Sequence, residues 1–202
     1  MPEITGVKER RGRARVSVDG EPWADLDAAV AIERGLREGV AFSWEELARI
    51  RAEGERPLAM NRALNLLGYR ARSEGEVRER LSRHGYATAT IEAVVGRLGE
   101  LGYLDDEEFA RQRAREKARK YGPRRVSAEL AKSGIGRELA AEVVAEEFAG
   151  RSELEDARRA AARRYNGTGS EAEARRVYGF LARRGYSAGV CAEVAGEHRG
   201  RA

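Results

Sequence analysis

The chain has 202 residues, and its 38 Lys and Arg outnumber its 34 Asp and Glu, which gives a formal net charge of +4. Cys191 is the only cysteine, so an internal disulfide is excluded. No apolar run approaches the roughly 20 residues that span a bilayer. The start, Met1-Pro2-Glu3, lacks the basic and apolar run of a signal peptide. We therefore expect a cytoplasmic protein that does not enter a membrane.

The first 59 residues predict a small module of short strands and helices. The segments ITGVKER and RARVSV flank Arg11-Gly12, which is typical of a hairpin turn, and DGEPWADL is expected to add a third strand. Two short helices are predicted next, over LDAAVAIERGL and SWEELARIRAE, the second capped by Ser43. Trp23 and Trp44 are expected to pack this region. Because its pattern does not recur, we predict that residues 1–59 form a separate N-terminal module.

Three later stretches share one pattern: LSRHGY at 81–86, LAKSGI at 130–135 and LARRGY at 181–186. Each is Leu-x-x-x-Gly followed by Tyr or Ile, and a valine lies thirteen residues after each Leu. The glycine fits the C′ position of a helix, where the backbone is left-handed, and the next residue is expected to fold back as an apolar contact. The pattern predicts three tandem three-helix repeats, with Gly85, Gly134 and Gly185 as the caps.

The predicted repeats occupy residues 60–104, 105–149 and 150–202. In the first, apolar residues on one helical face begin at Met60, and Ser73 opens the second helix with a capping box. Pro123 fits the first turn of the middle helix in the second repeat, and Ser170 is a cap in the third.

A single repeat of this size is small for independent stability, so neighbouring repeats are expected to pack into an elongated, curved array. The predicted fold class is mainly α: tandem three-helix repeats preceded by a small N-terminal module with a β-hairpin and helices.

The residues that catalysis requires are scarce in this chain. His84 is expected on the surface, His198 in a frayed C-terminal end, and Cys191 in the core as a small residue. The four acids from Asp105 to Glu108 fit a helix N-terminus. Neither His nor Cys clusters as a metal site requires. We therefore predict a non-enzyme with no catalytic residue, no metal and no cofactor.

The segment FARQRAREKARKYGPRR, residues 109–125, is strongly basic. On a helix, its alanines and Tyr121 would form a packed seam with basic residues on both flanks, spaced about 6 Å apart, which is close to the phosphate spacing of a nucleic-acid strand. The segment has one acidic residue, Glu116, which cannot form ion pairs with eight basic residues. The basic side chains therefore need ion-pair partners from acidic helices of neighbouring repeats, from an acidic protein groove or from phosphate. They are Arg111, Arg113, Arg115, Lys117, Arg119, Lys120, Arg124 and Arg125.

Weaker basic clusters occupy the other two repeats. They include Arg72 and Arg80 in repeat one, and Arg163 and Arg164 in repeat three. Residues 60–202 together hold 28 basic and 22 acidic residues, because residues 1–59 hold 10 and 12 of the totals of 38 and 34. This excess favours a polyanionic partner. We predict that these four residues and the 109–125 segment form one basic face that binds a partner or DNA.

These motifs resemble those of the RecX family of bacterial recombination regulators, over roughly residues 60–190. YRARSEGEVRERLSRHGY is similar to the family's Arg-x-(Arg)-Ser-x-x-Glu-(Leu/Val)-x-x-x-Leu-x-x-x-Gly-(Tyr/Phe) stretch. LGELGYLDDEEFA is similar to Leu-x-x-x-Gly-Tyr-(Leu/Ile)-(Asp/Asn)-Asp-x-x-Phe-Ala, and KYGPRRVSAELAKSGI is similar to Gly-Pro-x-(Arg/Lys)-(Ile/Val)-x-x-x-Leu-x-x-(Lys)-Gly-(Ile/Val). Ser133 departs from the pattern, because a basic residue is common before that glycine, and this weakens the case for a partner contact there.

The resemblance implies tandem three-helix repeats without enzymatic activity. It implies binding to the RecA recombinase, especially to the RecA filament on single-stranded DNA. It also implies inhibition of the ATPase, strand-exchange and co-protease activities of RecA in DNA repair, homologous recombination and the SOS response. An elongated basic array would lie along the filament groove. Single- or double-stranded DNA is a second expected partner, and the expected oligomeric state is a monomer.

The alternative is an autonomous DNA-binding protein built from helix-turn-helix-like units. Such a protein would present base-reading Asn, Gln or Arg near the start of an exposed helix. Outside turns the chain has only Asn61, Asn65 and Gln112 as amide side chains, which disfavours sequence-specific readout.

Overall fold

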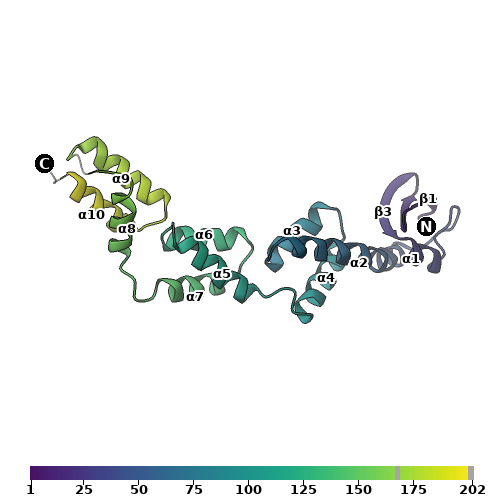
Figure 1. Cartoon of the computed structure of the whole chain (residues 1–202). Helices are drawn as coiled ribbons and strands as arrows, with labels where there is room; N and C mark the ends of the chain where they lie inside the picture. The colour runs from purple at the N-terminus through teal and green to yellow at the C-terminus, as the bar shows by residue number, and fades with distance from the viewer. Residues whose placement is uncertain (167–168, 200–202) are drawn as a thin grey trace. The chain divides into compact units, whose positions relative to one another are not determined.

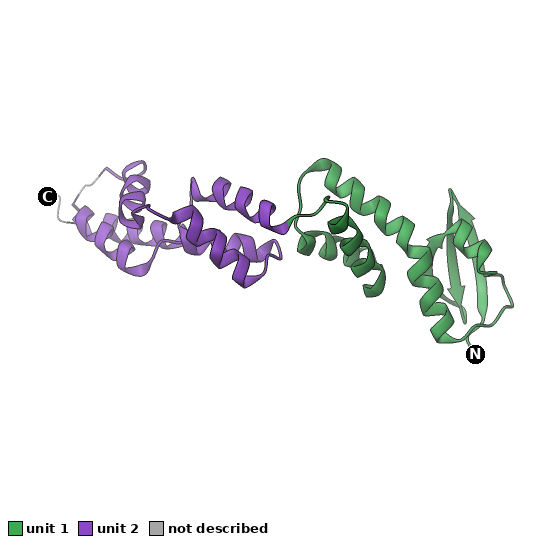
Figure 2. Cartoon of the chain, turned by 90° about the horizontal axis from the view of Figure 1, so that it is seen from below, with its two compact units in different colours: residues 1–105 green, residues 106–202 purple. Residues whose placement is uncertain are grey.

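The computed structural model describes residues 1–166 and 169–199, and the chain divides into two compact units, Met1–Asp105 and Asp106–Ala202 (Figure 1, Figure 2). The described residues form ten helices and one three-stranded sheet. This confirms the mainly α class with an N-terminal module that contains β-strands. The curvature of the expected array stays a prediction.

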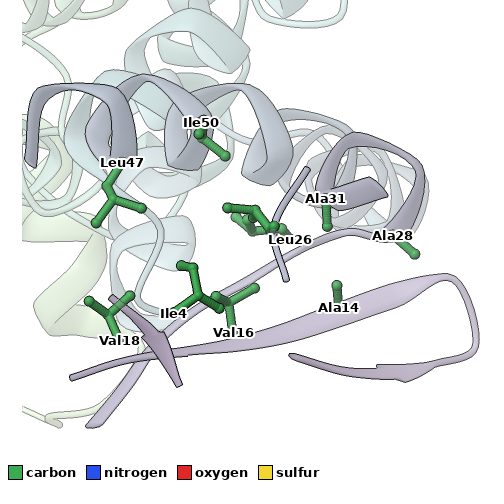
Figure 3. Packing of buried hydrophobic residues seen from close by; sticks show 10 residues of the cluster. Ile4, Ala14, Val16, Val18, Leu26, Ala28, Ala31, Leu47 and Ile50 are labelled. Atoms are coloured by element: carbon green, nitrogen blue, oxygen red, sulfur yellow. The ribbon is translucent and has the colours of Figure 1, made fainter. Parts of the chain in front are cut away.

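The N-terminal sheet is antiparallel in the order β1-β2-β3, with β1 at Ile4–Arg10, β2 at Arg13–Val18 and β3 at Glu21–Asp27. Arg11 and Gly12 have φ of 52° and 75°, the left-handed values of a tight turn, so the predicted hairpin is confirmed. Successive side chains alternate between the two faces. Figure 3 shows the buried face, where Ile4, Ala14, Val16, Val18 and Leu26 pack with Leu47 and Ile50.

Two helices cover that buried face: α1 at Ala28–Glu33 and α2 at Trp44–Tyr69. Asp27 caps α1 by accepting hydrogen bonds from the amides of Ala29 and Val30. Ser43 caps α2 in a reciprocal capping box with Glu46. Local polar side chains therefore define where both helices begin.

Helix α2 is one continuous helix of 26 residues, whereas the sequence predicted two helices. The predicted module boundary at 59/60 falls inside it. Gly54 and Pro57 both disfavour a helix interior, but tertiary packing overrides that preference. Gly54 is buried against Leu26 of β3, and a Cβ at that position would lie 2.9 Å from the Leu26 Cβ. The sheet and the first repeat therefore share α2 within one unit.

The two tryptophans lie in different environments. Trp23 is partly buried and packs against the sheet core, as predicted. Trp44 is 61% exposed, so its predicted packing role was wrong. It occupies the first position of α2, and the apolar face that meets the sheet is carried by Leu47 and Ile50 instead.

The first repeat is completed by α3 at Glu74–Arg83 and α4 at Thr88–Glu100, which pack against the second half of α2. Its core includes Ala63, Leu81, Val94 and Leu98. Ser73 accepts a hydrogen bond from the amide of Glu76, as the predicted cap requires. The Glu76 carboxylate pairs with Arg70 at 2.9 Å.

Glu55 joins α2 to the start of α4. Its carboxylate is buried, with the residue 2% exposed, and it pairs with Arg51 at 2.7 Å. It also accepts hydrogen bonds from the amide of Ala87 at 2.7 Å and from the hydroxyl of Thr90 at 3.0 Å. Ala87 is the N-cap residue of α4 and has no capping side chain, so α2 supplies the cap from 32 residues away.

The second unit holds two further repeats. Repeat two consists of α5 at Asp106–Ala118, α6 at Pro123–Lys132 and α7 at Arg137–Phe148. Repeat three consists of α8 at Glu153–Ala162, α9 at Glu171–Arg183 and α10 at Ala188–Arg199. Each has its own apolar core, and Val143 and Val194 are buried in the two cores as their repeat positions predict.

The three repeat glycines have the predicted left-handed backbone. Gly85, Gly134 and Gly185 have φ of 81°, 79° and 85°. In repeats two and three the amide of the next residue, Ile135 or Tyr186, donates back to the carbonyl of the repeat leucine. This is the hydrogen bond of a helix that ends at a C′ glycine, and it turns the chain toward the third helix.

Gly185 also joins repeat three to repeat two. The amide of Gly122 donates to the carbonyl of Arg184 at 2.8 Å, and the amide of Arg124 donates to the carbonyl of Gly185 at 3.2 Å. A Cβ on Gly122 would lie 2.8 Å from the Gly185 oxygen, and a Cβ on Gly185 would overlap the backbone of Arg125. Both positions therefore require glycine for this close backbone approach.

We expect Gly185→Ala to disrupt this joint, while Gly85→Ala is the matched control. Both glycines have positive φ, but a Cβ on Gly85 meets nothing within 4 Å. The control should cost about 1–2 kcal/mol for the left-handed alanine alone, and Gly185→Ala should cost more. Hydrogen exchange at the amides of Gly122 and Arg124 should accelerate only in Gly185→Ala. Unchanged exchange there would contradict the packing role.

We expect Glu55→Ala to destabilise the first unit by about 3 kcal/mol, because it leaves Arg51 and the amide of Ala87 without their buried acceptor. Both tryptophans lie in this unit, so a denaturant titration followed by tryptophan fluorescence reports it. Glu53→Ala is the control, because its pair with Arg34 is exposed and should contribute much less. Equal losses in the two variants would refute the capping role.

Candidate functional site

The two histidines and the cysteine lie in the buried interior or on the surface of the described structure. His84 is exposed, and its Nδ1 lies 3.1 Å from Arg62 Nη2. Cys191 is fully buried, as predicted, and burial raises the pKa of its thiol. His198 was predicted to fray, but it is only 6% exposed, and its Nδ1 lies 3.1 Å from the buried Glu173 carboxylate. That contact holds the end of α10 against α9.

The described residues hold neither a metal-binding cluster nor a helix suited to cross a membrane. In 1–166 and 169–199, no group of three or more His, Cys, Asp or Glu side chains is arranged to hold a metal ion. No helix in the same ranges has the length and apolar character needed to cross a membrane. The predicted acids at Asp106 to Glu108 form the first turn of α5, where they complement the helix dipole.

Helix α5 carries the first part of the basic segment, up to Ala118, whereas Arg119 and Lys120 lie in the turn after it and Arg124 and Arg125 lie in α6. Ala110, Ala114 and Ala118 are buried at 0%, 0% and 5% exposure and pack in the core of repeat two, with Tyr121 against its edge. Arg115, Arg119, Lys120 and Arg124 are exposed. The small alanine side chains let α5 lie close to α6 and α7, which leaves the longer basic side chains outside the core.

Half of the eight basic residues have carboxylate partners. Arg111 pairs with Glu107 and, at 3.5 Å, with Glu146 of α7. Arg113 and Lys117 share Glu116 at 3.2 and 3.3 Å. Arg125 pairs with Glu129 at 2.8 Å and lies over the Tyr121 ring. Acids just outside the 109–125 segment therefore supply several of the partners that the segment itself lacks.

Within the described part of the chain, the other four basic residues of the segment have no carboxylate partner. Across 1–166 and 169–199, no carboxylate lies within 4.0 Å of Arg115, Arg119, Lys120 or Arg124. These residues are concentrated toward the C-terminal end of α5 and the start of α6. Acidic residues of the chain therefore supply partners for half of the basic residues in the segment.

A cavity of about 380 Å³ lies where repeats two and three meet within unit Asp106–Ala202. Arg119 and Lys120 line it from the end of α5, and Arg184 and Tyr186 line it from the turn after α9. The remaining charged lining comes from α8 and the residues that flank it: Arg151, Asp156, Arg159 and Arg163. The cavity therefore has six cations and one carboxylate in its lining.

Asp156 compensates only two of those cations. Arg151 donates to its carboxylate at 2.7 Å, and Arg159 also pairs with it. Burial favours a raised pKa for Asp156, but these hydrogen bonds outweigh it and hold the pKa below its ordinary value. Arg184 donates to the carbonyl of Lys120 at 2.8 Å, which leaves its charge uncompensated. The cavity is therefore suited to an anion that brings several oxygen acceptors.

The structure brings Arg119, Lys120 and Arg163 together, but not every predicted residue. Arg164 lies over the Phe180 ring at 5.4 Å and does not line the cavity. Arg72 and Arg80 belong to the first unit. Arg72 is partly buried and donates to the carbonyl of Leu66 at 3.1 Å; desolvation, followed by the charge of Arg70, lowers its pKa.

Three lining residues were missed by the prediction of the site. Arg151 precedes α8, outside any basic run. Arg159 lies four residues before the predicted Arg163, and Arg184 lies within the repeated stretch LARRGY. The signal that identifies Arg184 is its repeat position: it precedes the glycine whose carbonyl meets repeat two, and so it lies at the joint.

Comparison with known proteins gives two family matches. The model described as "RecX, first three-helix domain" matches residues 59–98, and the model described as "RecX, second three-helix domain" matches residues 105–144. These ranges cover the second half of α2 with α3 and α4, and most of repeat two.

Individual proteins and structures agree with these matches. A "Regulatory protein RecX" of Listeria monocytogenes serotype 4a (strain HCC23) is 26% identical over 202 residues, covering 98% of this chain and 75% of that protein. One of Lactobacillus gasseri is 32% identical over 150 residues, covering 72% of this chain and 55% of that protein.

Two solved structures share the fold, each at 22% identity. "Crystal structure of regulatory protein RecX" aligns with a TM-score of 0.59 over 94% of this chain and 97% of that chain. "Crystal structure of RecX from Lactobacillus salivarius" aligns with a TM-score of 0.58 over 71% of this chain and 96% of that chain. With both three-helix domains present in order along repeats that the structure resolves as separate cores, the chain belongs to the RecX family of regulatory proteins.

Proposed function

We propose that this chain is a non-enzymatic regulator that binds the RecA recombinase assembled on single-stranded DNA. Binding inhibits the ATPase, strand-exchange and co-protease activities of RecA in DNA repair, homologous recombination and the SOS response. The protein acts in the cytoplasm as a monomer. The observation that carries this proposal is the cavity between repeats two and three, with six cations and one carboxylate in its lining.

The charge balance of unit Asp106–Ala202 supports a polyanionic partner. Arg115, Arg119, Lys120 and Arg163 are exposed and have no carboxylate within 4.0 Å in the described ranges. Cations brought together without acids cost stability by repulsion, and an external anion offsets that cost. A RecA filament on single-stranded DNA presents both acidic side chains and phosphates, so it fits a surface of this kind.

An autonomous DNA-binding protein is the second candidate, because the same cations also suit phosphodiesters. Base readout from a helix requires amide or Arg side chains directed into the major groove. The only amide in α5 is Gln112, which is exposed among the basic residues. This candidate therefore predicts DNA binding with a steep salt dependence and little sequence preference.

The first test is the ATPase rate of RecA from the same organism on single-stranded DNA at moderate salt, with this protein titrated in. We expect inhibition by the unmodified chain and at least tenfold weaker inhibition by Arg115→Glu/Arg119→Glu/Lys120→Glu. These three side chains are exposed and have no acidic partner, so circular dichroism should be unchanged.

The control variant is Arg175→Glu/Arg176→Glu/Arg183→Glu. It makes the same change in net charge at exposed positions of α9 that do not line the cavity. It should inhibit RecA nearly as well as the unmodified chain. Equal loss in the two variants would mean that only net charge matters. An ATPase rate that never changes, together with salt-dependent binding of free DNA, would favour the autonomous DNA-binding protein.

Asp156→Asn offers a test in the opposite direction. It removes the only carboxylate among the described residues that line the cavity. Arg159 then has no carboxylate within 4.0 Å in the described residues, and Arg151 keeps only its pair with Glu147 at 3.5 Å. One unit charge about 4 Å away in water contributes about 1 kcal/mol, so we expect about fivefold tighter binding to the RecA filament, measured by fluorescence anisotropy. A gain in affinity cannot arise from misfolding of the variant. Weaker binding by a variant with native circular dichroism would place the partner elsewhere.

A further inference from the structure

The outer face of the N-terminal sheet, opposite the core, is basic. In the β1–β2 register, Lys8 lies directly opposite Arg15, and Arg10 lies directly opposite Arg13. All four side chains are exposed, whereas the intervening Ala14 and Val16 are buried in the core. The alternation of a strand thus places four cations together on the exposed face.

This arrangement opposes the stability of the hairpin. Like charges directly opposite each other on paired strands are destabilising, and the hairpin has two such pairs in succession. Arg15 is compensated by Asp25 at 3.0 Å, but that pair is exposed. Asp27, the β3 residue opposite Arg13, uses its carboxylate to cap α1. In the described residues, no carboxylate lies within 4.0 Å of Lys8, Arg10 or Arg13.

Two grooves adjoin these cations. One, of about 400 Å³, is lined by Lys8, Glu9, Arg10, Arg13, Arg15 and Asp25. The other, of about 240 Å³, shares Arg15 and Asp25 with the first and is also lined by Trp23 of β3, by the paired Arg51 and Glu55 of α2, and by the rings of His84 and Tyr86. A row of cations therefore continues into a groove whose walls carry three aromatic rings.

This combination has a known chemical use. Proteins that bind single-stranded nucleic acids pair a positively charged groove, which follows the phosphates, with aromatic side chains on which bases stack. A duplex keeps its bases stacked inside and offers only phosphates. An acidic peptide would use the cations but not the aromatic groove, so the two grooves together favour a single strand.

We propose that the outer face of the N-terminal sheet, together with the adjoining groove that β3 and α2 line, binds single-stranded nucleic acid, with phosphates on Lys8, Arg10 and Arg13 and a base in that groove beside Trp23. This site is separate from the cavity between repeats two and three and does not depend on RecA. It gives the N-terminal module a function of its own.

The test follows Trp23 emission in the full-length Trp44→Phe variant, which retains Trp23 as its only tryptophan. The probe is a 20-nucleotide oligothymidine, and binding is also measured by anisotropy of a labelled copy. We expect quenching of Trp23 and at least tenfold weaker binding after Lys8→Glu/Arg10→Glu. Each glutamate would face an arginine across the hairpin, so the melting temperature should stay equal or rise while binding falls.

The matched control is Arg37→Glu/Arg49→Glu in the same background, which changes the net charge equally at exposed positions that line neither groove. It should keep both quenching and affinity. Three results would overturn the proposal: binding without a change in Trp23 emission, equal affinity for a 20-base-pair duplex, and equal competition by polyglutamate. Because RecA is absent from this assay, its failure is distinct from a failure of the proposed inhibition.

Discussion

The meeting of repeats two and three depends on a backbone contact between Gly122 and Gly185. The carbonyls of Arg184 and Gly185 accept the amides of Gly122 and Arg124, and neither glycine has room for a Cβ. On either side of this contact stand Lys120 and Arg184, whose side chains line the basic cavity. The glycine that ends a middle helix therefore also fixes the position of the cations from two different repeats.

Much of the fold could be predicted because it obeys local rules. The hairpin at Arg11-Gly12, the cap glycines and Pro123 at the start of α6 all depend on residues adjacent in sequence. The predictions were wrong where contacts between residues far apart in the sequence determine the local structure. Helix α2 continues through Pro57 because it packs on the sheet and on repeat one at once, and His198 is held by Glu173, 25 residues earlier.

The candidate site could be predicted only in part, because a sequence counts charges but does not show their partners. Arg111 and Arg125 find carboxylates four residues away, at Glu107 and Glu129, both just outside the basic segment. Other members of the site come from separate helices. Arg184 can be found from its position before a repeat glycine, but Arg151 comes close to Lys120 only through the fold, and no spacing in the sequence predicts it.

The division of the apolar residues into four separate cores has a consequence for cooperativity. A protein with one core unfolds in a single step, whereas a chain of small cores linked mainly to their neighbours opens one segment at a time. The described cores of repeats two and three each bury four alanines, whereas the core of repeat one buries two. Small side chains bury little apolar area, so we expect repeats two and three to open before repeat one and to become accessible to proteases while the sheet module stays folded.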